Sequence, residues 1–387
     1  MIMTVEALNA RHGDALLLHF GAPDDPQLAI CDGGPSGVYG AALQPRLSAI
    51  KDARGFEDAL PIEMAIVTHL DDDHIHGILD LFGRLAEAAD DRRDLSWQVR
   101  ELWLNQFDDL VGTGGDDLVS AAAAAARPDR SVPPGLLTTG DALAVAASVP
   151  QGRALTDHAR RLSVTINGAP LHGLVATGDD GGPTVDLGAG FSLTVLAPNR
   201  ARIEALHQEW DAVLRKAAAK TKQAALAEAA AYLDNSVYNL SSIVFLARGD
   251  GAAMLLTGDA RGDDILRALE GANLLSGGKL HLDLLKIPHH GSARNVDQDF
   301  FDAVTADHYL ISADGKFGNP DNETLQLILN ARRHDEFIIH MTNEVSRVTE
   351  FLQSNKSLAK NHVLEIRPGD APSIVIDLGQ PIESAGI

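Results

Sequence analysis

The run His69-Leu70-Asp71-Asp72-Asp73-His74 constrains this chain more than any other feature. Five of its six side chains can bind a metal ion, and imidazoles and carboxylates this close together need a cation among them. Residues 64–68 before the run are typical of a buried strand, and Gly77 and a helix-like segment follow it. Loops after strands often carry the chemistry of α/β folds. The run therefore predicts a metal site, and the alternative is a solvated acidic loop with incidental histidines.

The composition is that of an ordinary globular protein with a large core. The chain has 387 residues, of which 45% are hydrophobic and 22% charged, enough for one large domain with insertions or two modest ones. The single cysteine, Cys31, is expected to pack in the core, and it excludes internal disulfides and cysteine-rich zinc sites. No signal peptide or long apolar run is visible, so we expect a cytoplasmic protein without a membrane segment.

The chain is strongly acidic, with a net charge of −22 from 54 acidic and 32 basic residues. Such a field repels nucleic-acid backbones at long range and disfavours a non-specific binder of long DNA or RNA. A predicted helix at about 200–233 carries a basic face with Arg202, Arg215 and Lys222. This face is either solvated or a strip that contacts substrate.

Strands and tight turns dominate the first 85 residues and the segment after residue 236. We expect early strands at 4–8, 15–20, 27–32 and 64–68, a helix at 41–52, and later strands at 242–247, 253–256, 282–288, 308–312, 337–341, 362–366 and 373–378. Residues 88–235 differ, with alanine runs, Gly-rich turns and helical spacing. The prediction is a single domain over 1–387, with a helical, Ala-rich insertion or cap at 88–235 and C-terminal strands at 343–387 that complete the fold.

Possible ligands follow several separate strands. They are Asp32, the His69–His74 run, Asp259 and the pair His289-His290. Neighbouring strand ends lie along one edge of a sheet, so these groups can converge despite their separation in sequence. Two divalent ions about 3.5–4 Å apart need a bridging oxygen and several histidine or carboxylate donors. The sequence contains that set.

The His69-x-Asp71-x-Asp73-His74 pattern resembles the signature of the metallo-β-lactamase superfamily, in the variant with aspartate as the middle ligand. The ComEC-type branch is the most similar. Further elements resemble that branch in its order: His12–Leu17, Ile30–Gly34, Leu256–Asp259, Lys286–Ser292 and Ile311–Gly315. The resemblance covers about residues 1–85 and 236–342.

The resemblance implies an α/β fold, the four-layer αβ/βα sandwich of the superfamily, with two divalent ions, Zn²⁺ or Mn²⁺, at one edge. It implies that His69 and Asp71 bind the first ion, that Asp73 and His74 bind the second, and that Asp259 bridges them. His290 matches the last histidine ligand. His289 is either a ligand, a residue that contacts a ligand from outside the metal's coordination sphere, or a substrate contact. Asp32 is expected to orient a histidine ligand. Asp72 is expected to point away from the metal ions, toward residues behind the ligands or toward solvent. Ser292 and Asn239 are expected to contact substrate.

Two departures from the family pattern stand out. Residues 235–241 contain no histidine where many members have one, which leaves the first ion a ligand short. His158, His172 and His207 are distant candidates for that place. Asn319 stands where relatives often have the histidine of a Gly-His-Pro element.

The resulting functional prediction is a metal-dependent hydrolase in which Asp73, Asp259 and His290 are central to catalysis. The expected substrate is a phosphodiester, either a small molecule or a nucleic acid, so the enzyme would be a nuclease or a nucleotide phosphodiesterase. One alternative is hydrolysis of an ester, lactone or thioester at the same centre. The other is a non-catalytic regulatory protein that binds a protein partner through the insertion.

Overall fold

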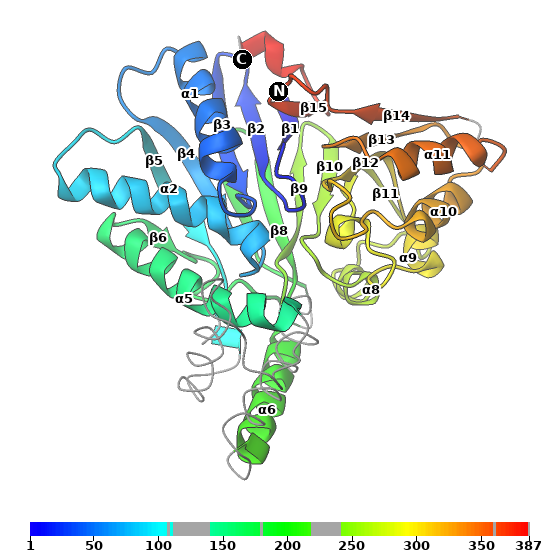
Figure 1. Cartoon of the computed structure of the whole chain (residues 1–387), viewed down its shortest axis with the longest axis horizontal. Coiled ribbons are helices and arrows are strands. Elements are labelled where there is room, and N and C mark those ends of the chain that lie inside the picture. Colours follow the sequence, from blue (N-terminus) through cyan, green and yellow to red (C-terminus); the bar gives the residue numbers. More distant parts are fainter. Residues whose placement is uncertain (107–108, 111–139, 179–180, 218–240, 359–360, 386–387) are drawn as a thin grey trace.

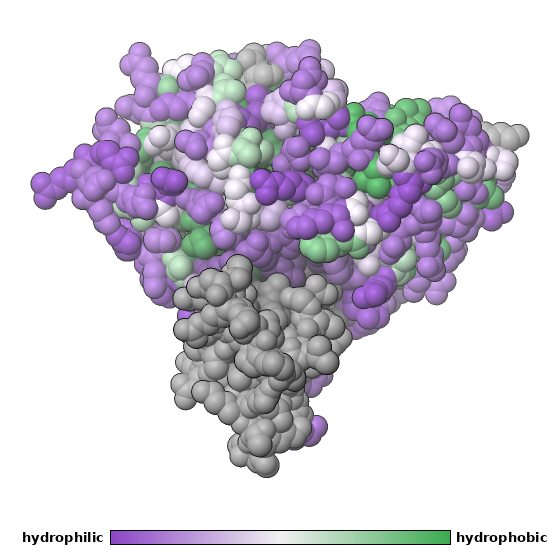
Figure 2. All heavy atoms as spheres, in the orientation of Figure 1, coloured by the Kyte–Doolittle hydropathy of each residue, from purple (hydrophilic) through white to green (hydrophobic). Residues whose placement is uncertain are grey.

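Two mixed β-sheets lie face to face in this chain, with helices on both outer sides (Figure 1). A computed structural model describes the chain over residues 1–106, 109–110, 140–178, 181–217, 241–358 and 361–385. No helix among these residues is long and apolar enough to cross a membrane. The face seen in Figure 2 is mostly hydrophilic, with hydrophobic residues scattered over it, as expected of an acidic chain.

The first sheet has the strand order β15-β1-β2-β3-β4-β5-β6. Neighbours from β15 to β3 are antiparallel, and neighbours from β3 to β6 are parallel. The strands are β1 (Ile2–Leu8), β2 (Leu16–Ala22), β3 (Asp25–Cys31), β4 (Leu60–Ile66), β5 (Trp97–Trp103), β6 (Thr165–Ile166) and β15 (Ser373–Asp377).

The second sheet has the order β14-β13-β12-β11-β10-β9-β8-β7. Neighbours from β10 to β14 are parallel, and neighbours from β7 to β10 are antiparallel. The strands are β7 (Thr184–Gly188), β8 (Phe191–Ala197), β9 (Val244–Gly249), β10 (Ala252–Leu256), β11 (Leu280–Lys286), β12 (Val304–Ile311), β13 (Phe337–Met341) and β14 (His362–Ile366).

Helices cover the outer face of each sheet (Figure 1). The first sheet carries α1 (Gln44–Ala53), α2 (Asp72–Asp90) and α5 (Gly140–Arg161), and a short π-helical turn, η1 (Tyr39–Leu43), precedes α1. The second sheet carries α8 (Gly262–Gly271), α9 (Gln298–Ala303), α10 (Asn322–Ala331) and α11 (Ser346–Ser354). Helix α6 (Arg200–Ala217) projects from the body of the molecule, and short 3₁₀ turns occur at η3 (Pro288–Gly291) and η4 (Ile382–Ala385).

Three hydrophobic layers hold these elements together. Successive side chains of a strand point to opposite faces, so Leu17 of β2 packs toward the helices whereas Leu18 packs toward the other sheet. The third layer lies between the second sheet and helices α8 to α11. Cys31 is buried in the layer between the sheets. The predicted four-layer αβ/βα sandwich is confirmed.

The expectation of a helical insertion at 88–235 needs correction. Its described part contains helices α5 and α6, but it also supplies β5 and β6 to the first sheet and β7 and β8 to the second. In these strands the alternation of hydrophobic and polar residues is short, and it was hard to recognise among the alanine-rich segments of this region. On the predicted basic helix face, Arg202 pairs with Glu209 at 3.4 Å, and the residues beyond 217 lie outside the described part.

A buried charge network fixes α1 against the first sheet. Glu6 of β1 accepts hydrogen bonds from Arg46 of α1 and Ser373 of β15, and it lies 3.1 Å from Nε2 of His19. Arg54 donates to Nδ1 of His19 at 3.1 Å, so Nε2 carries the proton that faces Glu6. Burial raises the pKa of Glu6, but His19 and Arg46 outweigh it and lower that pKa to about 2.

We therefore expect Glu6→Gln to destabilise the fold by about 3 kcal/mol at pH 7. The pKa of Glu6 in the folded state lies below its usual value, so its stabilising contribution is full above about pH 4.5 and disappears as the pH falls toward 2. Urea denaturation of both proteins at pH 7, 4 and 3 measures the difference, which should shrink with pH. The exposed Glu57→Gln is the matched control. An equal effect of the two substitutions at pH 7 would refute the network's contribution.

Candidate metal centre

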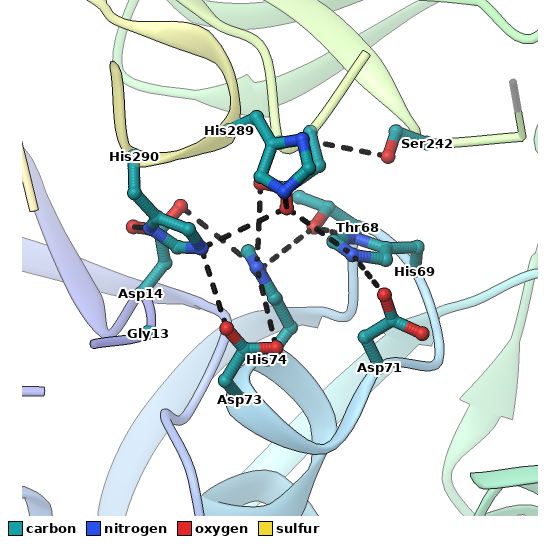
Figure 3. Close-up of polar contacts among 12 residues, drawn as sticks. Gly13, Asp14, Thr68, His69, Asp71, Asp73, His74, Ser242, His289 and His290 are labelled. Atoms are coloured by element: carbon teal, nitrogen blue, oxygen red, sulfur yellow. Dashed lines mark hydrogen bonds and ion pairs between the residues drawn. The ribbon is translucent and has the colours of Figure 1, made fainter. Parts of the chain in front are cut away.

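Loops from both sheets meet at one edge of the sandwich and bring acidic and histidine side chains together (Figure 3). From the first sheet, the β1–β2 turn contributes Asp14, and the loop after β4 and the first turn of α2 contribute the run His69–His74. From the second sheet, Asp259 follows β10, and His289 and His290 follow β11. These groups, far apart in sequence, form one cluster, as the strand ends predicted.

Asp259 lies in the middle of this cluster. Its Oδ1 is 3.4 Å from Nε2 of His74, and its Oδ2 is 3.7 Å from Nε2 of His290. The same Oδ2 is 3.8 Å from Nε2 of His69 and 3.6 Å from Nε2 of His289. The main-chain amide of Asp259 donates to Oγ of Ser242 at 3.3 Å, which ties the residue to the strand beside it. One carboxylate therefore faces four imidazoles.

Hydrogen bonds on the far ring nitrogens orient two of these imidazoles. Nδ1 of His74 is 2.9 Å from Oδ2 of Asp32. The same carboxylate accepts hydrogen bonds from the Thr68 amide at Oδ1 and from the Thr68 hydroxyl at Oδ2. Nδ1 of His290 is 2.9 Å from the main-chain oxygen of Ser312, which can only accept, so this nitrogen carries a proton. Both Nε2 atoms consequently turn toward Asp259. Such outer hydrogen bonds are what metal-binding histidines require.

The remaining two histidines approach Asp259 from another side. Nε2 of His69 lies 3.5 Å from Oδ2 of Asp71. Nδ1 of His289 lies 2.8 Å from Oδ1 of Asn295, whose amide nitrogen donates to the main-chain oxygen of Asp259 at 3.0 Å. The amide orientation of Asn295 is therefore fixed, and it holds the His289 ring with Nε2 inward. Asp73 completes the other side, 3.3 Å from Nε2 of His290.

The histidine pair stands on an unusual backbone. His289 has φ 49° and His290 has φ 55°, both in the left-handed region, and Gly291 follows with φ 86°. This region costs a side-chain-bearing residue about 1–2 kcal/mol. A Cβ on Gly291 would lie 2.5 Å from Cβ of Pro320, so only glycine fits at the third place. Strain of this kind concentrates where geometry serves a function.

Several buried polar atoms of the cluster have no hydrogen-bond partner among the described residues. Each such atom costs about 1–3 kcal/mol unless something satisfies it. All of them are nitrogen or oxygen atoms with lone pairs that a cation could share, and the three imidazole nitrogens among them lie within 3.8 Å of an oxygen of Asp259. They are Nε2 of His69, His74 and His290, Oδ1 of Asp71 and Oδ1 of Asp259. The donor set therefore fits a divalent metal ion.

A buried ion pair lies beneath the cluster. Nζ of Lys286 contacts Oδ2 of Asp14 and donates to the main-chain oxygen of Gly258 at 3.2 Å, and both side chains are at most 2% exposed. Asp14, His74, Asp259 and His290 offer ligand atoms within 4.8 Å of one another. Asp14 nevertheless faces the Nδ1 atoms, 3.4 Å from that of His290 and 3.9 Å from that of His74. It therefore supports the imidazoles from behind.

The charges of the cluster shift its pKa values strongly. Burial lowers the pKa of His290, but the carboxylates of Asp259 and Asp14 outweigh it and raise that pKa to about 10. The pKa of His74 is raised well above its usual range, because Asp259 and Asp32 likewise outweigh burial. The pKa of Asp259 falls well below its usual range, because the neighbouring histidines outweigh burial. Protons on the imidazoles thus balance the carboxylates, and a metal ion would replace them.

Other residues considered from the sequence lie away from this cluster. Asp72 points to α5, whose Gln151 amide donates to its Oδ1 at 2.9 Å, and Nδ1 of His76, one turn along α2, lies 2.9 Å from the same oxygen. Ser292 is buried, and its amide donates to the main-chain oxygen of His289 at 2.9 Å. His207 instead contacts the main-chain oxygen of Asp109 at 3.0 Å, and neither His158 nor His172 has a described contact with the cluster. Asn239 lies outside the described residues.

Sequence reasoning did not identify Asp14 and Lys286 as members of the site. Both belong to elements that it singled out, the His12–Leu17 turn and the Lys286–Ser292 segment. The available signal was a lysine that follows two leucines at the end of a predicted buried strand, because a buried lysine needs a carboxylate partner.

No protein-family model matches the sequence, and no curated protein matches it. Among solved structures, the chain is similar to the metallo-β-lactamase fold protein YhfI from Bacillus subtilis, with 10% identity, 97% of this chain and 99% of that chain covered, and a TM-score of 0.39. It is also similar to Zn²⁺-bound PqqB from Methylobacterium extorquens, with 10% identity, 97% and 100% coverage, and a TM-score of 0.41. These values are too low to transfer a function or a residue's role.

Removing the buried ammonium should destabilise the protein. In Lys286→Met the Asp14 carboxylate stays buried without its partner, which typically costs about 3–5 kcal/mol. Thermal unfolding followed by circular dichroism should show a large fall in the melting temperature. The exposed Lys279→Met should leave it unchanged, and adding Asp14→Asn to Lys286→Met should restore part of the loss. A melting temperature unaffected by Lys286→Met would show that the pair does not hold the site.

Proposed function

We propose that this chain is a metal-dependent hydrolase of the metallo-β-lactamase superfamily, and that its substrate is a phosphodiester. The observation that carries the proposal is the convergence of three unpartnered Nε2 atoms on the Asp259 carboxylate, whose own Oδ1 is also unpartnered. A merely structural cluster would satisfy these buried atoms within the protein. The motif resemblance to the ComEC-type branch supports the choice of phosphodiester.

The charge balance of the cluster favours two divalent ions. Apart from the histidines, one ammonium faces five carboxylates, so neutral imidazoles leave an excess of four negative charges. Two divalent cations would neutralise that excess, and a single one would leave half of it buried. The carboxylate-rich donors suit Zn²⁺ or Mn²⁺. The charged groups are Lys286 against Asp14, Asp32, Asp71, Asp73 and Asp259.

The donors divide into two groups around Asp259. His74, His290 and Asp73 form one group, and His69 and Asp71 form the other. We assign His289 to the second group, because the first group already has three donors besides Asp259 and the second has only two, and Nε2 of His289 faces Oδ2 of Asp259 as that of His69 does. This assignment supplies the nitrogen that the sequence left missing for the first ion. Asp259, between the groups, is the bridging ligand.

The chain's residues prepare the site for attack by water. When bound, the divalent ions supply the positive charge that acidifies water and stabilises a developing oxyanion. Asp32 and the Ser312 carbonyl keep protons on the Nδ1 atoms, which leaves Nε2 of His74 and His290 available as donors of electron pairs. Asp71 and Asp73 are 27% and 25% exposed, so the substrate would approach on their side.

The alternatives are hydrolysis of an ester, lactone or thioester at the same centre, and a non-catalytic protein that binds a partner. Turnover of carboxylic esters without turnover of phosphodiesters would favour the first. Absence of bound metal in the purified protein would exclude both hydrolase functions and favour the second. Much of the segment expected to bind a protein partner lies outside the described residues.

Asp259→Asn tests the central assignment. We expect loss of bound metal and a fall in kcat of about 10²- to 10³-fold or more on bis-p-nitrophenyl phosphate, because the carboxylate shared by both donor groups loses its charge. Inductively coupled plasma mass spectrometry and absorbance assays measure the two effects. Asp72→Asn, between the proposed ligands Asp71 and Asp73 but with its side chain facing α5, is the matched control and should change kcat less than about 3-fold. Full activity in Asp259→Asn would overturn the assignment.

His289→Ala separates the two donor groups. If His289 completes the second group, with His69 and Asp71, the variant should keep one ion per chain where the wild type holds two, because the group around His74 and His290 is intact. Metal analysis after dialysis counts the ions, and the exposed His281→Ala is the control. Retention of both ions in His289→Ala would remove His289 from the ligands and leave the metal centre itself in place.

A further inference from the structure

A loop over residues 312–321 runs along the histidine turn of the candidate metal centre. It begins at Ser312, whose carbonyl accepts from His290. Farther along, the Asn319 side-chain amide donates to the main-chain oxygen of His289 at 3.4 Å. The amide of Asp321 donates to the main-chain oxygen of Gly291 at 2.9 Å. The loop is therefore fastened to the metal centre at both ends.

The middle of the loop is also held in place. The Arg347 guanidinium donates to the main-chain oxygens of Gly318 and Pro320. The amide of Gly318 donates to the oxygen of Gly315 at 3.1 Å, and the amide of Lys316 donates to Oδ1 of Asp314 at 2.9 Å. A loop tied in this way fixes the direction of the side chain at its tip.

That tip displays an aromatic ring to solvent. Phe317 is 68% exposed, the highest value for a large hydrophobic side chain among the described residues. Aromatic residues make up only 5% of this sequence, and most described ones are buried. Phe317 adds little to the core, yet the loop holds its ring in place. An exposed, preorganised ring of this kind offers a stacking surface for a planar ligand.

The groups around the ring connect it to the metal centre and to negative charge. The His12 ring packs edge-on against Phe317, with centroids 5.0 Å apart and an interplanar angle of 84°. His12 precedes Gly13, where a Cβ would lie 2.0 Å from the main-chain oxygen of Asp73, so this turn touches a proposed ligand loop. Nζ of Lys316 lies 4.7 Å from the Phe317 centroid. In a chain of net charge −22, this ammonium provides positive charge at the ring.

On the basis of the proposed phosphodiester hydrolysis, we infer that Phe317, with Lys316 and His12, forms a subsite that stacks a nucleobase of a nucleotide substrate beside the metal centre. The ring binds the planar base, His12 limits its movement on one side, and the Lys316 ammonium attracts the phosphate. The substrate class is thus a nucleotide or a short single strand with unpaired bases, because bases in a duplex have no face free to stack.

Phe317→Ala tests this subsite against the thymidine dinucleotide phosphodiester and its abasic analogue, which keeps the sugar and phosphate groups. We expect KM for the dinucleotide to rise about 10- to 100-fold with kcat little changed, and KM for the abasic analogue to stay the same. Phe317→Trp should restore the wild-type KM. Phe56→Ala, at an exposed ring in the turn before β4, is the matched control. Equal effects of Phe317→Ala on both substrates would overturn the subsite.

Binding without turnover separates this inference from the proposed activity. Isothermal titration calorimetry compares deoxyadenosine monophosphate with deoxyribose 5-phosphate on the wild type and Phe317→Ala. A base-dependent affinity that is lost in Phe317→Ala supports the subsite even if no phosphodiester is hydrolysed. Phosphodiester hydrolysis with no base-dependent affinity would leave the proposed function intact and overturn the subsite. A Phe317-dependent KM for aryl esters, without one for nucleotides, would overturn the nucleobase assignment.

Discussion

The buried ion pair between Asp14 and Lys286 is the contact on which the geometry of the candidate metal centre depends. Asp14 follows β1 in the first sheet, and Lys286 ends β11 in the second, so the pair joins the two halves of the sandwich at the edge where the loops emerge. The same ammonium holds the Gly258 carbonyl, next to Asp259. A buried ion pair stabilises a structure only if the two charged groups are well placed relative to each other and their remaining hydrogen bonds are made, because both groups have lost their contact with water. Here the geometry fixes the place of Asp259 relative to His74 and His290, because Asp14 also faces the Nδ1 atoms of both rings.

Above this pair, the cluster is assembled at a cost that folding alone does not explain. His289 and His290 occupy left-handed backbone conformations, and the nearby Asp32 does so as well, with φ 59°. Unpartnered ring nitrogens and carboxylate oxygens add to that cost. Divalent ions would relieve the electrostatic part of it, since they satisfy the lone pairs and allow the imidazoles to release their protons. Metal binding and stability should therefore be coupled in this protein.

Much of this architecture could be predicted from the sequence, and the reasons differ between its parts. Largely apolar runs such as 64–68 revealed the buried strands, and the ligand residues stood at their ends, where α/β folds place chemistry. The strands β5 to β8 were missed because weakly alternating segments lie among alanine-rich stretches, and only pairing with distant strands makes them part of a sheet. Asp14 was missed as a neighbour of His290 because the two residues are far apart in the sequence and come together only in the folded chain. The orientation of His289 by Asn295 likewise depends on how a left-handed turn folds back, which residue spacing does not specify.

The site thus has a buried base and a partly exposed opening, and this difference decides from which side a substrate can enter. Asp14, Asp32, Lys286 and the ring of His74 are almost wholly buried and fill the base. The opening is formed by Asp71, Asp73 and His289, whose side chains are 25% to 31% exposed. The loop of residues 312–321 contacts the main chain of His289 beside that opening, so the proposed subsite of Phe317 and Lys316 would lie next to the site. In so acidic a chain, an anion needs such a local positive charge to approach a carboxylate-rich centre, and the bound ions would then supply the rest of the attraction.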